Sequence, residues 1–289
     1  MSTTQYQNRA AVLKKLQQTY QIDSLDLAAV NLEISPDDNM FAEGFDDHYF
    51  SVGFSGLINI LTSLACAQKG KHNVKSIFDF PSGWGRELRF IKAYFPEADI
   101  TAGEIEERAL TFCRKQFAVN TFLSQKDFNK IPVKHKYDLI WCGSLFTHLS
   151  KVRFKQLLDF FYHSLHDDGM LCFTAHGRYA RHLLDSKKFT YGLNKWQIAK
   201  LLLQHKISGY GYINYRGTID YGISLVRPSW IIRSLEMNDQ LKVVLYKEKG
   251  YDNHQDVIAC VKQAISGQVP SVAQDDSAGQ PDTPSQPTS

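Results

Sequence analysis

Residues 74–103 read VKSIFDFPSGWGRELRFIKAYFPEADITAG, and Glu104 follows directly. The segment from Ser76 to Phe80 is short and apolar, which predicts a strand. The glycines at positions 83 and 85 then predict a tight turn. We therefore expect a strand whose carboxyl end leads at once into a glycine-rich turn.

A helix and a second strand follow this turn. Apolar residues recur there at the spacing of one helix face: Leu88, Ile91 and Phe95. Pro96 ends the helix, residues 99–102 have a strand pattern, and Glu104 stands where that strand would end. This order is typical of a site for a nucleotide-type ligand, because glycines let the backbone approach the ligand and the later carboxylate can bind ribose hydroxyls.

The composition is that of a globular α/β protein. The chain has 289 residues, of which 43% are hydrophobic and 12% are aromatic. This length suits one α/β domain with additions and is short for two full domains. The formal net charge is only +3 and no dense run of lysine and arginine occurs, so we expect no nucleic-acid partner.

The five cysteines are scattered and form no C-x-x-C motif. Most of them lie in apolar segments, where a thiol packs as a small hydrophobic group, and we therefore expect a reducing, cytoplasmic location. The N-terminus lacks the apolar core of a signal peptide, and no apolar run approaches the roughly 18 residues that span a bilayer. We expect neither a membrane span nor a metal site.

The rest of the chain alternates between helix and strand patterns up to residue 176. The expected helices lie at residues 9–20, 57–67, 106–117 and from 150 onward. The expected strands lie at residues 119–123, 137–142 and 170–175, the last after a turn at 166–169. Beyond these, we expect helices at 194–204 and 228–235, short strand-like pieces at 209–215 and 221–226, and a closing hairpin of strands 241–246 and 257–261.

This order predicts an α/β fold with a seven-stranded, mostly parallel sheet, helices on both faces and an antiparallel terminal strand. We divide the chain into an N-terminal helical or lid segment (1–70) and an α/β domain (71–264) with a substrate-side insert (177–239). Residues 265–289 are rich in proline and lack aromatic and basic residues, which predicts a disordered tail.

Residues 74–176 together resemble a class I (Rossmann-like) S-adenosylmethionine (SAM)-dependent methyltransferase, and residues 240–262 resemble it in topology. That family has the turn D-x-G-x-G-x-G; residues 79–85 read DFPSGWG, with Pro81 in place of the first glycine. The segment DLIWCGSLFTHL at 138–149 is similar to the family's fourth-strand motif, and HSLHDDGML at 163–171 resembles its approach to the fifth strand. The resemblance implies SAM as the cofactor and a methyltransferase as the enzyme.

The resemblance also implies specific cofactor contacts. Glu104 would hold the ribose hydroxyls, Asp127 would bind the adenine amino group, and Phe128 would stack on the ring or pack in the core. Arg86 would bind the methionine carboxylate. The other implied contacts come from the glycine turn and the strand ends: Asp79, Pro81, Ser82, Gly83, Gly85, Ile105 and Cys142.

Most of these residues also have a purely structural interpretation. Asp79 and the glycines could form only a tight turn, and Glu104 could be a solvated acid at a helix N-terminus. Asp127 could be an ordinary loop acid. Cys142 could simply pack in the core, and Arg86 could pair with a nearby carboxylate.

The acceptor half of the site is less clearly encoded. His148 after the fourth strand and His176 after the fifth are candidates for a general base, with capping or packing as the alternative. Residues 254–256 are interpreted as a turn. Half-exposed aromatic side chains often line clefts, and a crowded group of tyrosines could form an acceptor-binding wall: Tyr210, Tyr212, Tyr215 and Tyr221.

We expect methyl transfer to a small-molecule or glycan acceptor. Two alternatives stay open. One is a non-catalytic SAM-binding module, which Pro81 permits. The other is an NAD-dependent oxidoreductase, against which the lack of a G-x-G-x-x-G motif argues. No N-P-P-Y-like motif follows the fourth strand, which argues against nucleic-acid methylation.

Overall fold

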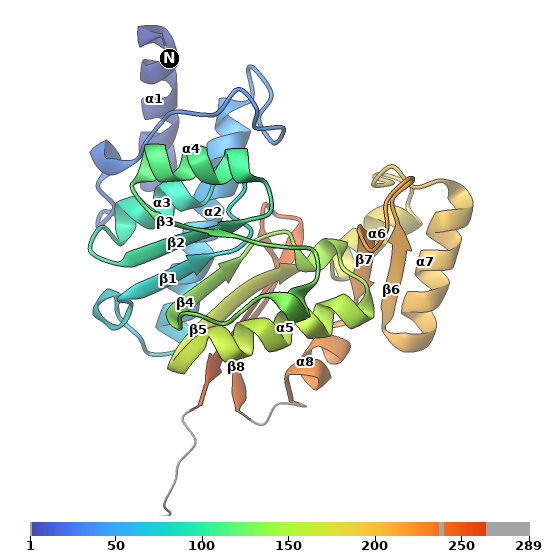
Figure 1. Cartoon of the computed structure of the whole chain (residues 1–289). Helices are drawn as coiled ribbons and strands as arrows, with labels where there is room; N and C mark the ends of the chain where they lie inside the picture. The colour runs from blue at the N-terminus through green and yellow to red at the C-terminus, as the bar shows by residue number, and fades with distance from the viewer. Residues whose placement is uncertain (1, 237–239, 264–289) are drawn as a thin grey trace, which may run out of the picture.

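The computed structural model describes residues 2–236 and 240–263. Within these residues, seven strands form one sheet in the order β3-β2-β1-β4-β5-β9-β8 (Figure 1). Adjacent strands in the part β3-β2-β1-β4-β5 run parallel to each other, whereas β9 runs antiparallel to both β5 and β8. The strands are Ser76–Asp79 (β1), Asp99–Glu104 (β2), Asn120–Leu123 (β3), Tyr137–Cys142 (β4), Leu165–Ala175 (β5), Leu241–Tyr251 (β8) and Gln255–Lys262 (β9). The predicted fold class is confirmed.

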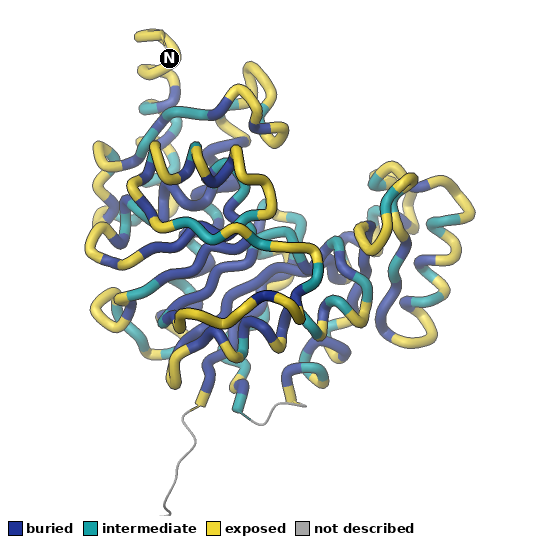
Figure 2. The backbone as a smooth tube through the Cα atoms, in the orientation of Figure 1, coloured by how far each residue is buried: buried dark blue, intermediate teal, exposed yellow. Residues whose placement is uncertain are grey.

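Helices cover both faces of this sheet. The helices are Thr3–Tyr20 (α1), Asp46–Cys66 (α2), Leu88–Tyr94 (α3), Glu107–Phe117 (α4), Lys151–Ser164 (α5), Arg178–Asp185 (α6), Lys195–Ser208 (α7) and Pro228–Glu236 (α8). Figure 1 shows α3 and α4 on one face and α5 and α8 on the other. Figure 2 shows that the strands between them are mostly buried, while the outer sides of the helices are exposed.

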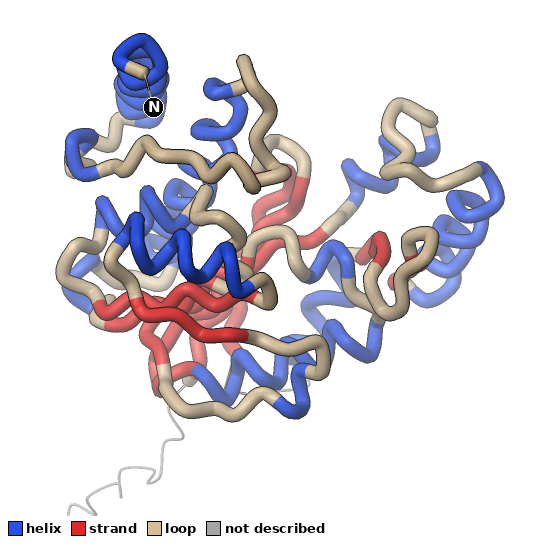
Figure 3. The backbone as a smooth tube through the Cα atoms, turned by 45° about the horizontal axis from the view of Figure 1, so that its top comes forward, coloured by secondary structure: helices blue, strands red, loops and turns tan. Residues whose placement is uncertain are grey.

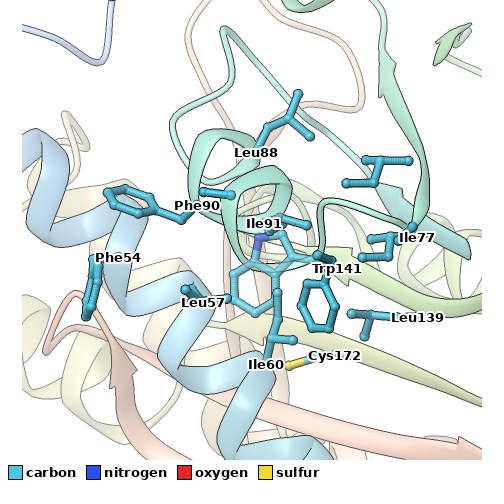
Figure 4. Close-up of a cluster of buried hydrophobic side chains, with 14 of the residues drawn as sticks. Phe54, Leu57, Ile60, Ile77, Leu88, Phe90, Ile91, Leu139, Trp141 and Cys172 are labelled. Atoms are coloured by element: carbon cyan, nitrogen blue, oxygen red, sulfur yellow. The ribbon is translucent and has the colours of Figure 1, made fainter. Parts of the chain in front are cut away.

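The central strand β4 shows how the sequence produces these two layers. Leu139 and Trp141 belong to the hydrophobic cluster beneath α2 and α3, whereas Ile140 and Cys142 belong to the cluster on the α5 face. Alternate residues of a strand point to opposite faces, so a strand covered on both sides needs an unbroken apolar run. Figure 4 shows the indole of Trp141 enclosed by side chains of α2, α3 and the neighbouring strands.

Helix α2 begins at Asp46, well before the predicted start at residue 57. Gly53 and Gly56 both lie inside this helix. A Cβ at Gly53 would lie 2.3 Å from the carbonyl oxygen of Arg86, and one at Gly56 would lie 2.9 Å from the side chain of Glu87. The glycines therefore allow α2 to pack closely on the segment after the glycine turn, a tertiary cause that a local pattern does not reveal.

Among the described helices, α2 is also the one that is long and apolar enough to cross a bilayer. In this structure, 61% of its apolar window is buried inside the protein. Phe50, Phe54 and Leu57 are completely buried in the cluster that covers the sheet. We therefore interpret α2 as a core helix.

Several other elements differ from the expectation. Helix α6 was not predicted. Strand β5 runs through the predicted turn at 166–169, with a register irregularity opposite Tyr137 and Leu139. Strands β8 and β9 extend to a tight turn at 252–254, because polar residues of β8 continue the pairing at the exposed edge of the sheet.

The insert forms its own small module. Strands β6 (Tyr210–Asn214) and β7 (Gly222–Val226) pair antiparallel, and α6 and α7 pack against them around a separate hydrophobic cluster. Figures 1 and 3 show this module at one side of the main sheet. The Val226 N–H donates to the carbonyl oxygen of His176 (2.9 Å), which joins the module to the end of β5.

The proposed division of the chain at residues 70 and 264 stays a prediction. Helices α1 and α2 share one hydrophobic cluster with the sheet, so the N-terminal segment contributes directly to the main core. The predicted disordered tail, residues 265–289, lies outside the described residues.

Candidate active site

The turn after β1 is held by the strands on either side of it. The Phe80 N–H donates to the carbonyl oxygen of Trp141 in β4 (2.9 Å), and the Ser82 N–H donates to that of Gly103 in β2 (2.9 Å). Pro81 lies between these two positions, and the Phe80–Pro81 peptide bond is cis. Proline has no N–H to donate, but both of its neighbours keep their bonds to the sheet.

Both glycines of the turn have a left-handed backbone conformation. The angle φ is +51° at Gly83 and +83° at Gly85, a region that other residues rarely adopt. A Cβ at Gly85 would lie 2.3 Å from the ring of Phe117, whereas a Cβ at Gly83 would meet no atom within 4 Å. Gly85 is therefore needed for packing, and Gly83 leaves open space beside the backbone, as a closely bound ligand requires.

Glu104, at the end of β2, faces this turn. One carboxylate oxygen accepts a hydrogen bond from the Gly83 N–H (3.0 Å), and the other accepts one from the Ile105 N–H (2.7 Å). The oxygen that faces Gly83 keeps a further lone pair, whereas the other oxygen also accepts a hydrogen bond from the Glu106 N–H (3.4 Å). The half-buried carboxylate is thus fixed in an orientation that suits the ribose-binding role, which stays a prediction.

Asp79 is buried beneath the turn, and its Oδ2 has no hydrogen-bond partner among the described residues. Burial and the nearby carboxylates of Glu87 and Glu104 raise the pKa of Asp79 well above its usual value. Ser82 Oγ in the same turn is also buried without a partner in the described part of the chain. Buried polar atoms are nearly always hydrogen-bonded in native proteins, so a polar ligand at this turn would supply the missing partners.

A pocket of about 530 Å³ opens beside Glu104. This volume is in the range of small-molecule sites. Four of the predicted cofactor residues line it together: Pro81, Glu104, Ile105 and Phe128. The opposite wall comes from the insert, through residues 217–219 and Tyr221.

Asp127 lies outside the lining of this pocket. Its carboxylate accepts a hydrogen bond from the Asn129 N–H (3.2 Å) and lies 3.5 Å from the Nζ of Lys130. The ring of Phe128 is buried, and the guanidinium carbon of Arg153 lies 4.6 Å from its centroid. The adenine-binding roles of Asp127 and Phe128 stay predictions, and the geometry favours Phe128.

Arg86 and Cys142 are engaged within the protein. Arg86 donates one hydrogen bond to Glu87 (3.0 Å) and another to the hydroxyl of Tyr251 (3.0 Å), and that hydroxyl donates to Glu87. Cys142 is completely buried on the α5 face, where burial raises the pKa of its thiol. Both placements correspond to the structural alternatives, so the geometry gives their cofactor roles no support.

His148 and His176 lie close together beyond β4 and β5, with ring centroids 6.5 Å apart. His148 Nδ1 lies 2.8 Å from the carbonyl oxygen of Gly222 and 3.2 Å from the hydroxyl of Tyr215. Burial lowers the pKa of His148. Burial, with His148 and His254 nearby, lowers the pKa of His176 well below its usual value. Both imidazoles are therefore neutral at pH 7.

The turn between β8 and β9 adds a histidine that the sequence pattern did not single out as a site residue. His254 Nε2 lies 2.7 Å from the hydroxyl of Tyr191, and its ring lies 5.4 Å from that of His176. His176 Nδ1 is buried and has no partner among the described residues. His176, Tyr191 and His254 are separated in the sequence, so only the tertiary fold reveals that they form a cluster.

The four predicted tyrosines separate into two pairs. Tyr221 lines the pocket and stacks on His148, with centroids 4.9 Å apart, and Tyr215 lies 5.8 Å from each of these rings. Tyr210 and Tyr212 instead lie on one face of β6 and pack on the hydrophobic cluster of the α5 face. An acceptor-binding role therefore has geometric support only at Tyr215 and Tyr221, and it stays a prediction.

Residues 78–171, from β1 into β5, match the sequence model of a methyltransferase domain. The matched segment contains the glycine turn, Glu104 and the loop of Phe128, and its strands lie in the sheet in the order β3-β2-β1-β4-β5. Over these residues, the chain is similar to class I methyltransferases. This class uses SAM as the methyl donor, so the enzyme class and cofactor implied by the sequence are confirmed.

Solved structures are similar to this chain, and one of them reaches a TM-score of 0.50. A Listeria monocytogenes protein assigned as a SAM-dependent methyltransferase has a TM-score of 0.50 at 14% identity, with 73% of this chain and 98% of that chain covered. DesVI from Streptomyces venezuelae has a TM-score of 0.49 at 12% identity, covering 77% and 100% of the two chains. The N-methyltransferase NodS from Bradyrhizobium japonicum, in complex with S-adenosylhomocysteine, has a TM-score of 0.46 at 12% identity, with 85% of this chain and 97% of that chain covered. A search of curated proteins found no sequence match.

The residues of the glycine turn fit SAM. Asp79 and Ser82 offer buried polar atoms that lack partners, and Gly83 leaves room for a ligand beside the backbone. Glu104 offers oriented acceptor oxygens beside the pocket. The NAD-dependent alternative loses its support, because the matched domain is a methyltransferase domain.

Proposed function

We propose that this methyltransferase transfers the methyl group of SAM to a hydroxyl of an uncharged small-molecule or glycan acceptor, with His148 as the general base. The observation that carries the proposal is the hydrogen bond between His148 Nδ1 and the carbonyl oxygen of Gly222. A carbonyl oxygen only accepts, so Nδ1 must carry the proton and Nε2 must hold the lone pair.

His148 is in the right state to accept a proton. Burial lowers the pKa of its imidazole, so the ring is neutral at pH 7. Its Nε2 has no hydrogen-bond partner in the described part of the chain. It is also absent from the fully buried side-chain atoms that lack a partner there, so it is not sealed inside the protein. A substrate hydroxyl could therefore approach Nε2 and lose its proton to it.

The surroundings of His148 favour an uncharged acceptor. The rings nearest to it are those of Tyr215, Tyr221 and His176. Burial raises the pKa of Tyr215 to about 12 and also raises that of Tyr221, while the pKa of His176 is lowered. All these groups are neutral at pH 7, so they offer hydrogen bonds and ring faces but no charge to pair with an ionic acceptor.

The chemistry divides clearly between cofactor and protein. When bound, SAM supplies a methyl group on an already activated sulfonium. The protein therefore needs mainly to align the acceptor oxygen with that methyl group, and such alignment can contribute up to about 7–11 kcal/mol. Glu104 and the glycine turn would fix the cofactor, and His148 would take the proton of the acceptor.

An acceptor screen with mass-spectrometric detection tests this function. The enzyme and SAM are incubated with separate sets of phenols, sugars, amines and carboxylic acids. We expect a methylated hydroxyl product with the wild-type enzyme and a loss of about 10²–10⁴-fold in rate with His148→Gln. A product formed only from amines or carboxylic acids would contradict the proposed acceptor class.

The non-catalytic alternative rested on Pro81. The turn keeps its bonds to β2 and β4 on both sides of this proline, so the geometry offers it no support. We also propose a cytoplasmic location, because all five cysteines are unpaired in the structure, as a reducing compartment would keep them.

A further inference from the structure

The loop between β6 and β7 reaches the cofactor pocket. It belongs to the insert, which the sequence assigned to the acceptor side, yet Gly217, Thr218, Ile219 and Tyr221 line the same pocket as Glu104. The loop starts after β6, and its positive φ of +77° at Gly217 marks a sharp turn. We call residues 215–221 the hairpin loop.

Arg153, on the first turns of α5, holds the hairpin loop in this position. Its guanidinium donates one hydrogen bond to the carbonyl oxygen of Asp220 (3.1 Å) and another to the carbonyl oxygen of Lys126. It also lies over the ring of Phe128, 4.6 Å from the centroid. One side chain thus joins the hairpin loop to the segment after β3 that forms the opposite wall of the pocket.

The hairpin loop also carries an apolar side chain, Ile219, that is largely exposed to solvent. Ile219 is 87% exposed although it lines the pocket, and Ile105, next to Glu104, is 51% exposed and lines it too. A flat, weakly polar ring between such side chains would remove apolar surface from water, which favours binding. The adenine of SAM is such a ring.

We propose that the hairpin loop and Arg153 are part of the cofactor site and close over the adenosine end of SAM. This inference rests on the proposed SAM site beside Glu104. The same loop would also connect the two halves of the active site, because His148 contacts Tyr215 within the loop and Gly222 directly after it. Ordering of the loop by the cofactor would then orient the general base before the acceptor binds.

Calorimetric titration with S-adenosylhomocysteine and with adenosine tests the proposal. Arg153→Gln removes the connection between the two walls, and Ile219→Ser removes the apolar contact. We expect each variant to bind both ligands about tenfold more weakly than the wild type, by the same factor for each ligand, because the loop contacts only the part that the ligands share. Thermal melting confirms that the variants are folded.

Two control variants change the same kinds of side chain at positions away from the pocket. Lys155→Gln removes a positive charge from the exposed side of the same helix, and Ile207→Ser removes an exposed isoleucine from α7 (77% exposed). Neither residue lines the pocket. We expect both controls to bind S-adenosylhomocysteine as the wild type does.

Trypsin cleavage gives an independent measurement, because Arg216 is exposed within the hairpin loop. We expect S-adenosylhomocysteine to protect the bond after Arg216 in the wild type but not in Arg153→Gln at the same ligand concentration. If wild type and Arg153→Gln bind equally and no protection occurs, the loop proposal is wrong while the SAM site stands. If the wild type does not bind S-adenosylhomocysteine at all, the proposed function itself fails.

Discussion

The carboxylate of Glu104 accepts a hydrogen bond from the backbone N–H of Gly83, with 3.0 Å between the two atoms. This bond connects the end of β2 to the turn after β1, so the two parts of the expected cofactor site are fixed relative to each other. The cavity beside Glu104 and the open space at Gly83 lie at the same edge of the sheet. In open α/β sheets, ligands bind at the carboxyl ends of the strands.

The two glycines of the turn should respond differently to substitution by alanine. Gly85→Ala would place a Cβ 2.3 Å from the ring of Phe117, so we expect a loss of about 1–3 kcal/mol from overpacking in addition to backbone strain. Gly83→Ala meets no atom and should cost only about 1–2 kcal/mol of backbone strain. Because its Cβ would occupy ligand space, it should still weaken SAM binding at least as much as Gly85→Ala. Denaturant unfolding and calorimetry measure the two effects, and equal losses of stability would contradict the prediction.

Asp79 should reduce the stability of the ligand-free enzyme at neutral pH. Its pKa is raised in the folded state, so the protonated form is favoured there, and stability falls as the pH rises through that pKa. Asp79→Asn removes this cost, and a gain of about 1 kcal/mol would raise the melting temperature by about 2–4 °C. The same variant should bind SAM more weakly, because the carboxylate can pair with a cationic group of the cofactor. A variant that melts lower at pH 8 and binds SAM normally would show that Asp79 is only structural.

The pH dependence of the reaction should reveal His148. Burial lowers the pKa of His148, so kcat/KM should stay constant from pH 8 downward and decrease only below about 6.5, as the imidazole becomes protonated. His148→Gln should lose this acidic limb together with most of the rate. His163→Gln, at an exposed position of α5, is the matched control and should keep the wild-type profile. An unchanged profile in His148→Gln would exclude this residue as the base.

Local patterns predicted where the glycine turn and Glu104 lie in the fold, whereas their cofactor roles stay predictions. Gly83, Gly85 and Glu104 lie within one βαβ unit, where the spacing of strand, turn and helix fixes their positions. The apolar run of β4 likewise predicted a central strand, because both of its faces are buried. The start of α2 was not predicted, since the reason for its glycines is the backbone of Arg86, far along the chain.

The acceptor half could be predicted only in part for the same physical reason. The sequence marked Tyr210 and Tyr221 alike, but the pairing of β6 with β7 places the first in the core and the second on the pocket. Arg153 gave no signal, because its role depends on carbonyl groups of two loops that meet only in the folded protein. Such long-range contacts are not encoded in a local spacing.

The central claim is that Glu104 and the glycine turn bind SAM, and calorimetric titration with S-adenosylhomocysteine tests it most directly. Glu104→Ala removes both acceptor oxygens beside the pocket, whereas Glu106→Ala removes an exposed carboxylate two residues away and serves as the control. We expect binding by the wild type and by Glu106→Ala, a loss of about 100-fold or more with Glu104→Ala, and no binding of NAD. Wild-type affinity in Glu104→Ala, or binding of NAD in place of S-adenosylhomocysteine, would contradict the account.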